Sequence, residues 1–289
     1  MNGVILVNKP INVTSRDVVN YAIKKLGIKK IGHTGTLDPI ATGVMVLCIG
    51  KATKLVDLLT SKDKEYIAEV TLGIKTDTLD ITGQVLEKNK CSVSRNQLIR
   101  ILNSFKGKYM QEVPVYSSVK INGKKLYEYA RKNESVELPK REVHIKNIEL
   151  ISIDEDKCKF IFKCLVSKGT YIRSLIRDIC YKLNVIGTMS RLLRTKQGNF
   201  SIDNCINMND ISECKIVDPR EVLDIPIVKV NNTVKNKIIN GQLLDNDYND
   251  KMMLFVDEFD QTLAIYKVYD KDSNKIKPYI MLYDKEGMI

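Results

Sequence analysis

One aspartate stands in a glycine-rich segment between a predicted helix and a predicted buried strand. The segment reads Gly32-His33-Thr34-Gly35-Thr36-Leu37-Asp38-Pro39-Ile40-Ala41-Thr42-Gly43. Glycines allow a loop to approach another backbone closely, so this segment is suited to holding the Asp38 carboxylate at its tip, where it could act on a substrate. A phosphate-binding turn or a structural Asx-turn is the alternative interpretation.

Known nucleotide-binding and metal-binding patterns do not account for this loop. Its glycines fit neither the GxxxxGK[ST] phosphate loop nor the dinucleotide motif GxGxxG. The chain has seven scattered cysteines without a CxxC pair and only two histidines, His33 and His144. We therefore expect no metal, and free thiols in a reduced cytoplasm rather than disulfides. A metal-dependent hydrolase built on Asp38 is disfavoured, because no carboxylate cluster accompanies it.

Positive charge is concentrated in the first part of the chain. The 289 residues carry a net charge of +11, whereas residues 223–289 hold 9 lysines against 11 acidic residues. Residues 86–146 alone hold 14 basic and 6 acidic side chains, a net of +8. This distribution favours a polyanionic partner. No signal peptide and no apolar stretch near the roughly 20 residues of a membrane span are present, so we expect a cytoplasmic protein.

Hydrophobic periodicity and capping residues predict the elements that position the loop. A buried strand at Gly3–Val7 stops at Lys9-Pro10, and a helix capped by Thr14 or Ser15 ends at Gly27. A second buried strand covers Val44–Ile49. The later elements are a strand at 66–72, a helix from Ser94 to Gly107, an Asn122-Gly123 turn, a basic helix at 126–131, strands at 143–152 and 158–166, a helix after Gly169-Thr170 and a strand at 189–195.

These elements predict an α+β protein with a mixed, largely antiparallel sheet, because strands and helices do not alternate as in parallel βαβ folds. Asp218-Pro219 to Pro226 is the best boundary, since composition turns acidic there and short strands follow. We expect a domain at 1–222, with a basic insertion at about 86–146, and a small β-rich domain at 226–289.

Several motifs resemble, in order, those of the TruB family, the bacterial tRNA pseudouridine-55 synthases. The likeness spans roughly residues 3–200, and an ordered set of motifs is more specific than any single one. The matching segments are Gly3–Pro10, Gly32–Gly43 with the following strand and Gly50–Lys54, Lys64-Glu65-Tyr66, Thr76–Thr78 with Asp80 and Gly83, Pro114–Arg131, Ser167–Arg173 and Leu192–Thr195.

The resemblance implies a role for each matched position. Asp38 is the essential carboxylate, and Arg173 pairs with it and keeps it ionised. Tyr171 faces the reacting base and is the candidate to take the C5 proton. The substrate-binding positions are Tyr66, which stacks on uracil; Leu192, which packs beneath the site; His33, which fills the space left by the flipped base; and Lys9, Lys124, Lys125 and Arg131.

Alone, each of these residues has a simpler interpretation. Arg173 could be a surface ion-pair residue, and Tyr66, Tyr171 and Leu192 could be core side chains. The basic run 120–141 could be a solvated face, although its lysines and arginines alternate with Tyr127 and Tyr129, as RNA binding favours. The ordered motifs favour the functional interpretation.

The resemblance implies the isomerisation of a uridine in the T arm of tRNA, with no cofactor. The Asp38 carboxylate could attack C1′, abstract the C2′ proton or add to C6 of the base, and the sequence does not choose among these routes. The family carries a small C-terminal domain of the PUA type, and Val228–Leu244 looks like the start of one, although this tail is net acidic. No protein partner is implied, and we expect a monomer.

Two further interpretations remain, the first from a class other than enzymes and the second a different kind of pseudouridine synthase. One is a non-catalytic RNA-binding protein that opens and refolds tRNA, which would need no carboxylate–arginine pair. The other is a guide-RNA-dependent pseudouridine synthase, against which the basic insertion argues.

Overall fold

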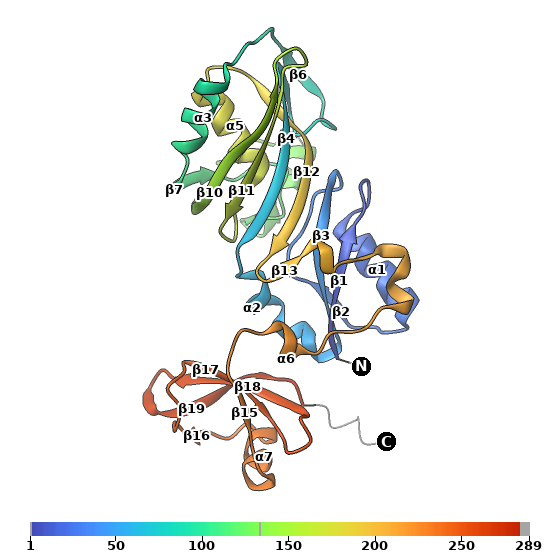
Figure 1. The fold of residues 1–289 in the computed structure, drawn as a ribbon, viewed down its shortest axis with the longest axis vertical. Coiled ribbons are helices and arrows are strands. Elements are labelled where there is room, and N and C mark those ends of the chain that lie inside the picture. The colour runs from blue at the N-terminus through green and yellow to red at the C-terminus, as the bar shows by residue number, and fades with distance from the viewer. Residues whose placement is uncertain (1, 133, 284–289) are drawn as a thin grey trace.

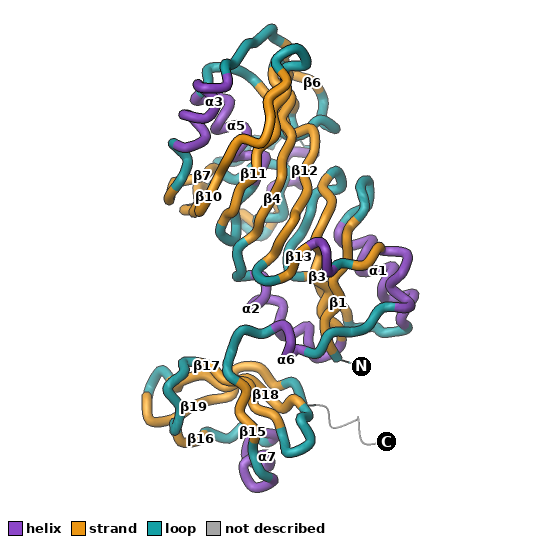
Figure 2. The backbone as a smooth tube through the Cα atoms, viewed as in Figure 1, coloured by secondary structure: helices purple, strands orange, loops and turns teal. Residues whose placement is uncertain are grey.

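The structure is a computed structural model that describes residues 2–132 and 134–283. Within these residues, one ten-stranded mixed sheet forms the body of the molecule, and a five-stranded sheet forms a smaller C-terminal unit. The two units follow one another along the long axis of the molecule (Figures 1 and 2). The α+β class expected from the sequence is confirmed.

The large sheet joins strands from the beginning and the end of residues 3–207. Its main order is β14-β1-β3-β12-β4-β11-β10-β7, with β2 beside β3 and β13 beside β12. Only β1–β14 and β3–β12 run parallel among the described pairings in this sheet. The strands are β1 (Gly3–Lys9), β2 (Ile31–His33), β3 (Ala41–Ile49), β4 (Lys64–Leu72), β7 (Gly107–Glu112), β10 (Lys140–Asp154), β11 (Lys159–Val166), β12 (Gly187–Gln197), β13 (Phe200–Ser201) and β14 (Ile206–Asn207).

Helix α1 (Ser15–Leu26) covers one face of β1 and β3. Thr14, not Ser15, is its N-cap, and Gly27 ends it with a φ of 67°, in the left-handed region. The helix buries Val18, Val19 and Ala22 against alternate residues of the two strands. The 3₁₀ helix η3 (Met208–Glu213) also contacts α1.

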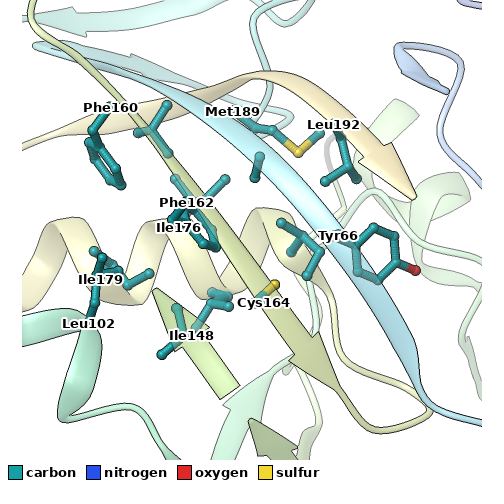
Figure 3. Close-up of a cluster of buried hydrophobic side chains, with 14 of the residues drawn as sticks. Tyr66, Leu102, Ile148, Phe160, Phe162, Cys164, Ile176, Ile179, Met189 and Leu192 are labelled. Atoms are coloured by element: carbon teal, nitrogen blue, oxygen red, sulfur yellow. The ribbon is translucent and has the colours of Figure 1, made fainter. Parts of the chain in front are cut away.

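The largest core lies between the other half of the sheet and two helices. Helices α3 (Arg95–Asn103) and α5 (Ile172–Lys182) bury apolar side chains against alternate residues of β4, β10, β11 and β12 (Figure 3). The alternating burial of β4 fits a strand with one face on a core. Helix α3 begins at its Ser94 cap as expected, but it ends at Asn103, and Gly107 begins β7 instead of closing the helix.

The basic segment 86–146 supplies strand β7 to the large sheet and also forms a separate hairpin and a short helix. Strand β7 pairs with β10 at the sheet edge. The hairpin of β8 (Lys120–Ile121) and β9 (Lys124–Lys125) turns through Asn122 and Gly123, both with positive φ, as that dipeptide predicts. Helix α4 (Leu126–Arg131) follows directly, and β5 (Ile74–Thr76) pairs with β6 (Val85–Lys88).

The C-terminal sheet has the order β15-β17-β18-β19-β16, with α7 (Asn232–Ile239) beside it. Its strands are β15 (Ile227–Lys229), β16 (Leu244–Asp245), β17 (Met252–Val256), β18 (Thr262–Tyr269) and β19 (Asp272–Met281). The 3₁₀ helix η2 (Ile202–Asn204) joins β13 to β14 within the large unit, and the connection to the C-terminal unit contains α6 (Pro219–Val222).

An apolar cluster joins the two units. Leu254, Ile265 and Ile280 of the C-terminal sheet belong to the same buried cluster as Val46 of β3 and Leu55, at the junction of η1 (Gly50–Leu55) and α2 (Val56–Thr60). Removing the C-terminal unit would therefore uncover apolar surface of the large unit.

Candidate active site

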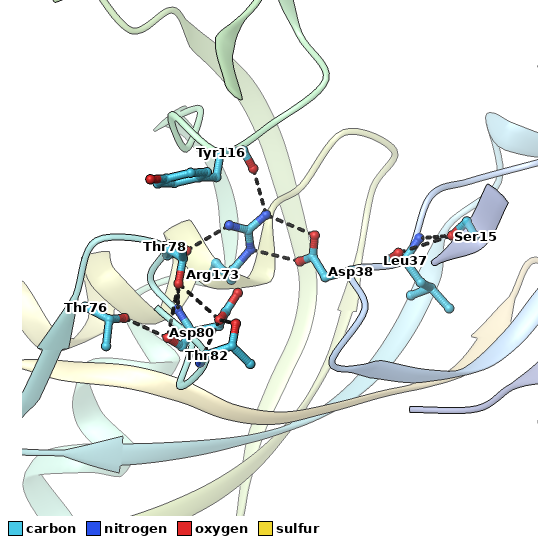
Figure 4. A network of polar contacts seen from close by, with 9 residues as sticks. All are labelled: Ser15, Leu37, Asp38, Thr76, Thr78, Asp80, Thr82, Tyr116 and Arg173. Carbon is cyan, nitrogen blue, oxygen red and sulfur yellow. Dashed lines mark hydrogen bonds and ion pairs between the residues drawn. The ribbon is translucent and has the colours of Figure 1, made fainter. Parts of the chain in front are cut away.

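Asp38 and Arg173 form a two-point ion pair at the centre of the site. Arg173 Nε donates to one carboxylate oxygen at 2.8 Å, and Nη2 donates to the other at 3.0 Å (Figure 4). The Arg173 side chain is almost wholly buried, whereas 32% of the Asp38 side chain remains exposed. The carboxylate is thus oriented by a planar cation and still accessible to a substrate.

Two backbone carbonyl groups hold the guanidinium in place. Nη1 donates to the Thr78 oxygen at 2.8 Å, and Nη2 donates to the Tyr116 oxygen at 3.0 Å. The Thr78 turn is itself fixed by Asp80, whose carboxylate accepts hydrogen bonds from the Thr78 hydroxyl and from the amide and hydroxyl of Thr82. Four hydrogen bonds therefore define the orientation of the Arg173 side chain.

The loop that carries Asp38 is fixed on both sides of the aspartate. Leu37 donates its amide to Ser15 Oγ at 2.9 Å, and the same hydroxyl donates to the Leu37 oxygen at 3.1 Å. On the other side, the Pro39 oxygen accepts a hydrogen bond from the Asn12 amide. Because α1 and the turn before it supply these contacts, the fold of the N-terminal segment sets the position of Asp38.

Lys9 lies beneath this loop and has no exposed surface. Its ammonium donates to the carbonyl oxygens of Pro10, Val13 and Pro39 at 2.8, 2.6 and 3.3 Å. Burial lowers the pKa of Lys9 to about 8, against the opposing effect of the Asp38 charge. This placement favours a role in holding the loop over the direct substrate contact expected from the sequence.

The side chains of Arg194 and Gln197, on β12, form hydrogen bonds to residues at the start of the segment that carries Asp38. Arg194 Nε donates to the Val44 oxygen at 2.6 Å, and Nη2 donates to the Gly35 oxygen at 3.2 Å. Gln197 Nε2 donates to the hydroxyl of Thr34. His33 is half-buried at the end of β2, and its Nδ1 accepts the Gly35 amide. Burial, and next the Arg194 charge, lower the pKa of His33.

Tyr66 and Leu192 belong to the large core at the end nearest the Asp38 loop. Leu192 pairs with Ala41 in the parallel register of β12 and β3. Tyr66 and Leu192 lie in the large core (Figure 3), and the same cluster contains Leu37 and Ile40. Only 8% of Tyr66 is exposed. Tyr66 and Leu192 therefore share a core with Leu37 and Ile40, which stand on either side of Asp38 in the sequence.

Tyr171 precedes Arg173 by two residues and caps the start of α5. Its amide and carbonyl groups are bound by the Gln111 side chain. Among the described residues, the Tyr171 hydroxyl has no hydrogen-bond partner.

The cations expected to contact RNA lie together on the hairpin and on α4. Lys124 stands over the Tyr129 ring at 4.3 Å and pairs with Glu134. Lys125 and the Arg131 guanidinium stand 5.4 and 5.3 Å from the Tyr127 ring centroid. The rings of Tyr127 and Tyr129 therefore lie against lysine and arginine side chains of the same hairpin and helix.

Sequence reasoning missed the groups that orient Arg173 and the loop. Thr78 and Tyr116 act through backbone carbonyl groups, which every residue type has, so no residue pattern could indicate them. Ser15 was considered only as a helix cap, whereas its hydroxyl binds Leu37 across 22 residues of sequence. Gln111 is a polar residue on an edge strand, where a solvated side chain is the ordinary expectation.

No helix among the described residues is long and apolar enough to cross a membrane. Nor do those residues gather three or more His, Cys, Asp or Glu side chains in a group that could hold a metal ion.

The sequence is similar to a known protein family over most of its length. Residues 24–172 match the model of the family described as "TruB family pseudouridylate synthase (N terminal domain)". A "tRNA pseudouridine synthase B" of Caldanaerobacter subterraneus subsp. tengcongensis is 46% identical over 253 residues, which cover 86% of this chain and 88% of that protein. A protein of the same name from Staphylococcus aureus is 41% identical, with 96% of this chain and 98% of that one covered.

Solved structures show the same fold at lower sequence identity. The protein in an H/ACA ribonucleoprotein bound to a substrate RNA containing 2′-deoxyuridine superposes with a TM-score of 0.73 at 23% identity, covering 98% of this chain and 86% of that one. A Cbf5–Nop10–Gar1 complex gives a TM-score of 0.71 at 24% identity, covering 98% and 84%. Together with the family match and the full-length relatives, these findings establish that the chain belongs to the TruB family of pseudouridylate synthases.

Proposed function

We propose that this protein isomerises uridine 55, in the T loop of tRNA, to pseudouridine, and that it does so without a guide RNA and without a cofactor. Family membership and the shared name of its relatives support a tRNA pseudouridine synthase. The observation that carries the proposal is the Asp38–Arg173 pair, in which a buried guanidinium orients an accessible carboxylate. A protein that only binds RNA needs no such pair.

The isomerisation sets the demands on the site. The bond between N1 of uracil and C1′ breaks, the base rotates, and a new bond joins C5 to C1′, while C5 loses a proton and N1 gains one. Because C1′ and C5 are covered inside a stacked loop, the uridine must be flipped into the site. Asp38 would assist by attack at C1′, by removal of the C2′ proton or by addition to C6, all of which use an ionised carboxylate.

The remaining site residues have roles that fit their surroundings. Tyr171, at the N-cap of α5 and two residues before Arg173, is proposed to face the flipped base and take the C5 proton. Tyr66 is proposed to stack on the uracil, and Leu192 to form the wall beneath it. His33, at the end of β2, is proposed to occupy the space that the flipped base leaves in the RNA.

We propose that residues 1–222 form the catalytic domain and residues 226–289 a PUA-like domain, and that the protein acts as a cytoplasmic monomer. RNA docking is assigned to the basic insertion, in particular to Lys124, Lys125 and Arg131. Helix α4, which carries Arg131, is hydrogen-bonded to the segment before it. The amides of Leu126 and Tyr127 donate to the Val119 and Ser117 oxygens. Ser117 and Val119 follow Tyr116, whose carbonyl oxygen accepts a hydrogen bond from Arg173. The segment that orients Arg173 is thus hydrogen-bonded to helix α4.

The test is nucleotide-resolution mapping of pseudouridine in an unmodified tRNA transcript incubated with the purified protein alone. Pseudouridine at position 55, and an unmodified transcript when the protein is omitted, would support the proposal. A tRNA that binds but stays unmodified would favour the RNA-binding interpretation. Modification only after a guide RNA is added would contradict stand-alone action.

A further inference from the structure

Gln111 connects the edge strand β7 to Tyr171, the N-cap residue of α5. Its Oε1 accepts the Tyr171 amide at 2.8 Å, and its Nε2 donates to the Tyr171 carbonyl oxygen at 3.1 Å. A side-chain amide carries a donor and an acceptor in one plane, so it can bind a backbone amide and carbonyl as a neighbouring strand would. Only 1% of Gln111 is exposed, so water does not replace these contacts.

The orientation of the Gln111 amide is fixed from its other side. Nε2 also donates to the Tyr109 hydroxyl at 2.6 Å, and this hydroxyl donates to Asp178 of α5 at 3.4 Å. A chain of hydrogen bonds therefore runs from Asp178 through Tyr109 and Gln111 to Tyr171. If the amide were turned over, its oxygen would face the Tyr171 carbonyl and its NH₂ group would face the Tyr171 amide.

The neighbouring residue of β7 binds the same helix without touching Tyr171. The Glu112 carbonyl oxygen accepts the Ser174 hydroxyl at 2.8 Å, and the Glu112 carboxylate accepts Arg177 Nη1 at 2.8 Å. Residues 171, 174 and 177 follow one another at helical spacing and all contact β7. Within this interface, Gln111 makes the contact at the N-terminal end of α5, where Tyr171 and Arg173 lie.

We propose that Gln111 is a positioning residue for the isomerisation, which it serves by fixing the Tyr171 backbone and, through it, the start of α5 relative to Asp38. This inference rests on the proposed roles of Tyr171 and Arg173. Small displacements of reacting groups lower rates strongly, by about 100-fold for an ångström. Loss of the Gln111 contacts should therefore affect the chemical step more than RNA affinity.

The test compares Gln111→Leu with Ser174→Ala, which removes a hydrogen bond from the same strand–helix interface but leaves Tyr171 bound. Single-turnover rates of tritium release from C5-labelled tRNA and tRNA dissociation constants are measured for both. We expect Gln111→Leu to lower the rate about 10- to 100-fold, with affinity within about threefold of wild type and the Ser174→Ala rate nearly unchanged. A Gln111→Leu rate within about threefold of wild type, or equal losses in both variants, would overturn the proposal.

A Gln111→Glu variant keeps the inference testable where the leucine variant does not fold. A protonated glutamate can accept the Tyr171 amide and donate to its carbonyl group, whereas an ionised one cannot donate. Its ionisation is set by Asp178 and Arg177 on α5 and by Tyr109 and Glu112 on β7. The rate of this variant relative to wild type should fall as pH rises, and a ratio independent of pH would contradict the inference.

An Asp38→Asn control separates failure of this inference from failure of the proposed function. If Asp38→Asn is inactive while Gln111→Leu is fully active, only the role of Gln111 is lost. If wild-type protein produces no pseudouridine, the proposed function itself fails.

Discussion

Arg173 binds both carboxylate oxygens of Asp38 although the two residues are 135 positions apart in the sequence. Asp38 belongs to the loop between β2 and β3, which α1 supports, whereas Arg173 belongs to α5, which packs on the other half of the sheet. The ion pair therefore joins a loop fixed by α1 to a helix on the other half of the sheet, and Leu37 and Ile40 of that loop pack in the same core as α5. The geometry of the site depends on the relative position of this loop and this helix.

We expect Arg173→Ala to remove about 3–5 kcal/mol of transition-state stabilisation, because it leaves Asp38 without its cation. This corresponds to a kcat/KM that is roughly 10²- to 10⁴-fold lower. Arg173→Lys should recover only part of the loss, since an ammonium cannot bind both carboxylate oxygens and both carbonyl groups in one plane. Steady-state kinetics with tRNA transcripts measures both variants.

Arg177→Lys is the matched control, because it makes the same change one turn later on α5, where the arginine pairs with Glu112 and Asp178. Its kcat/KM should stay close to wild type. Full activity of Arg173→Lys would contradict the importance of the two-point geometry.

We expect any side chain at Gly43 to destabilise the fold, because it would collide with the backbone of the adjacent strand β12. A Cβ at Gly43, where φ is 104°, would lie 2.2 Å from the Arg194 carbonyl oxygen of the adjacent strand. Gly107 has nearly the same φ, 108°, but no atom within 4 Å of the equivalent Cβ. We expect Gly43→Ala to lower the free energy of unfolding by about 1–3 kcal/mol more than Gly107→Ala. Urea denaturation measures both, and equal losses would rule out the close approach.

The sequence predicted the elements better than the contacts between them. Periodicity and caps located α1, α5 and the central strands, because these signals are local. The Asp38–Arg173 pairing was expected only through resemblance, since no local signal connects two positions so far apart. The burial of Lys9 beneath the loop depends on the three-dimensional path of residues 10–13 and 39. The packing of the C-terminal sheet on β3 likewise has no counterpart in local sequence.

The neutral state of His33 makes stability depend on pH. Burial and the Arg194 charge lower its folded-state pKa below the ordinary 6.5, so the unfolded chain binds the proton first as pH falls. The stability that neutral His33 contributes is complete above about 6.5 and is lost as pH falls through the folded-state pKa. We expect the free energy of unfolding of wild type to decrease on acidification more than that of His33→Gln. Urea denaturation across this pH range tests the sign, and parallel curves would refute it.

The basic insertion should supply most of the electrostatic affinity for tRNA. Residues 86–146 carry a net charge of +8, whereas residues 223–289 carry −2. Replacing Lys124, Lys125 and Arg131 with alanine should weaken binding and flatten the dependence of log K on log salt by about 0.7–0.9 for each lost phosphate contact. Salt titrations of tRNA binding measure the slope.

Deleting the C-terminal domain is a poor control, because its sheet shares a buried cluster with β3. Alanine at Lys267, Lys275 and Lys277 removes the same charge from that sheet without uncovering the cluster. This triple variant should change the slope little. If it flattens the slope more than the insertion variant does, the insertion is not the main docking surface.

Asp38→Asn tests the central claim most directly, because it keeps the shape of the side chain and removes the charge that Arg173 binds. The measurement is single-turnover tritium release from C5-labelled tRNA, with tRNA affinity determined in parallel. We predict that release is abolished while the dissociation constant stays within about threefold of wild type. A release rate within about tenfold of wild type would contradict the role of Asp38 as the essential carboxylate.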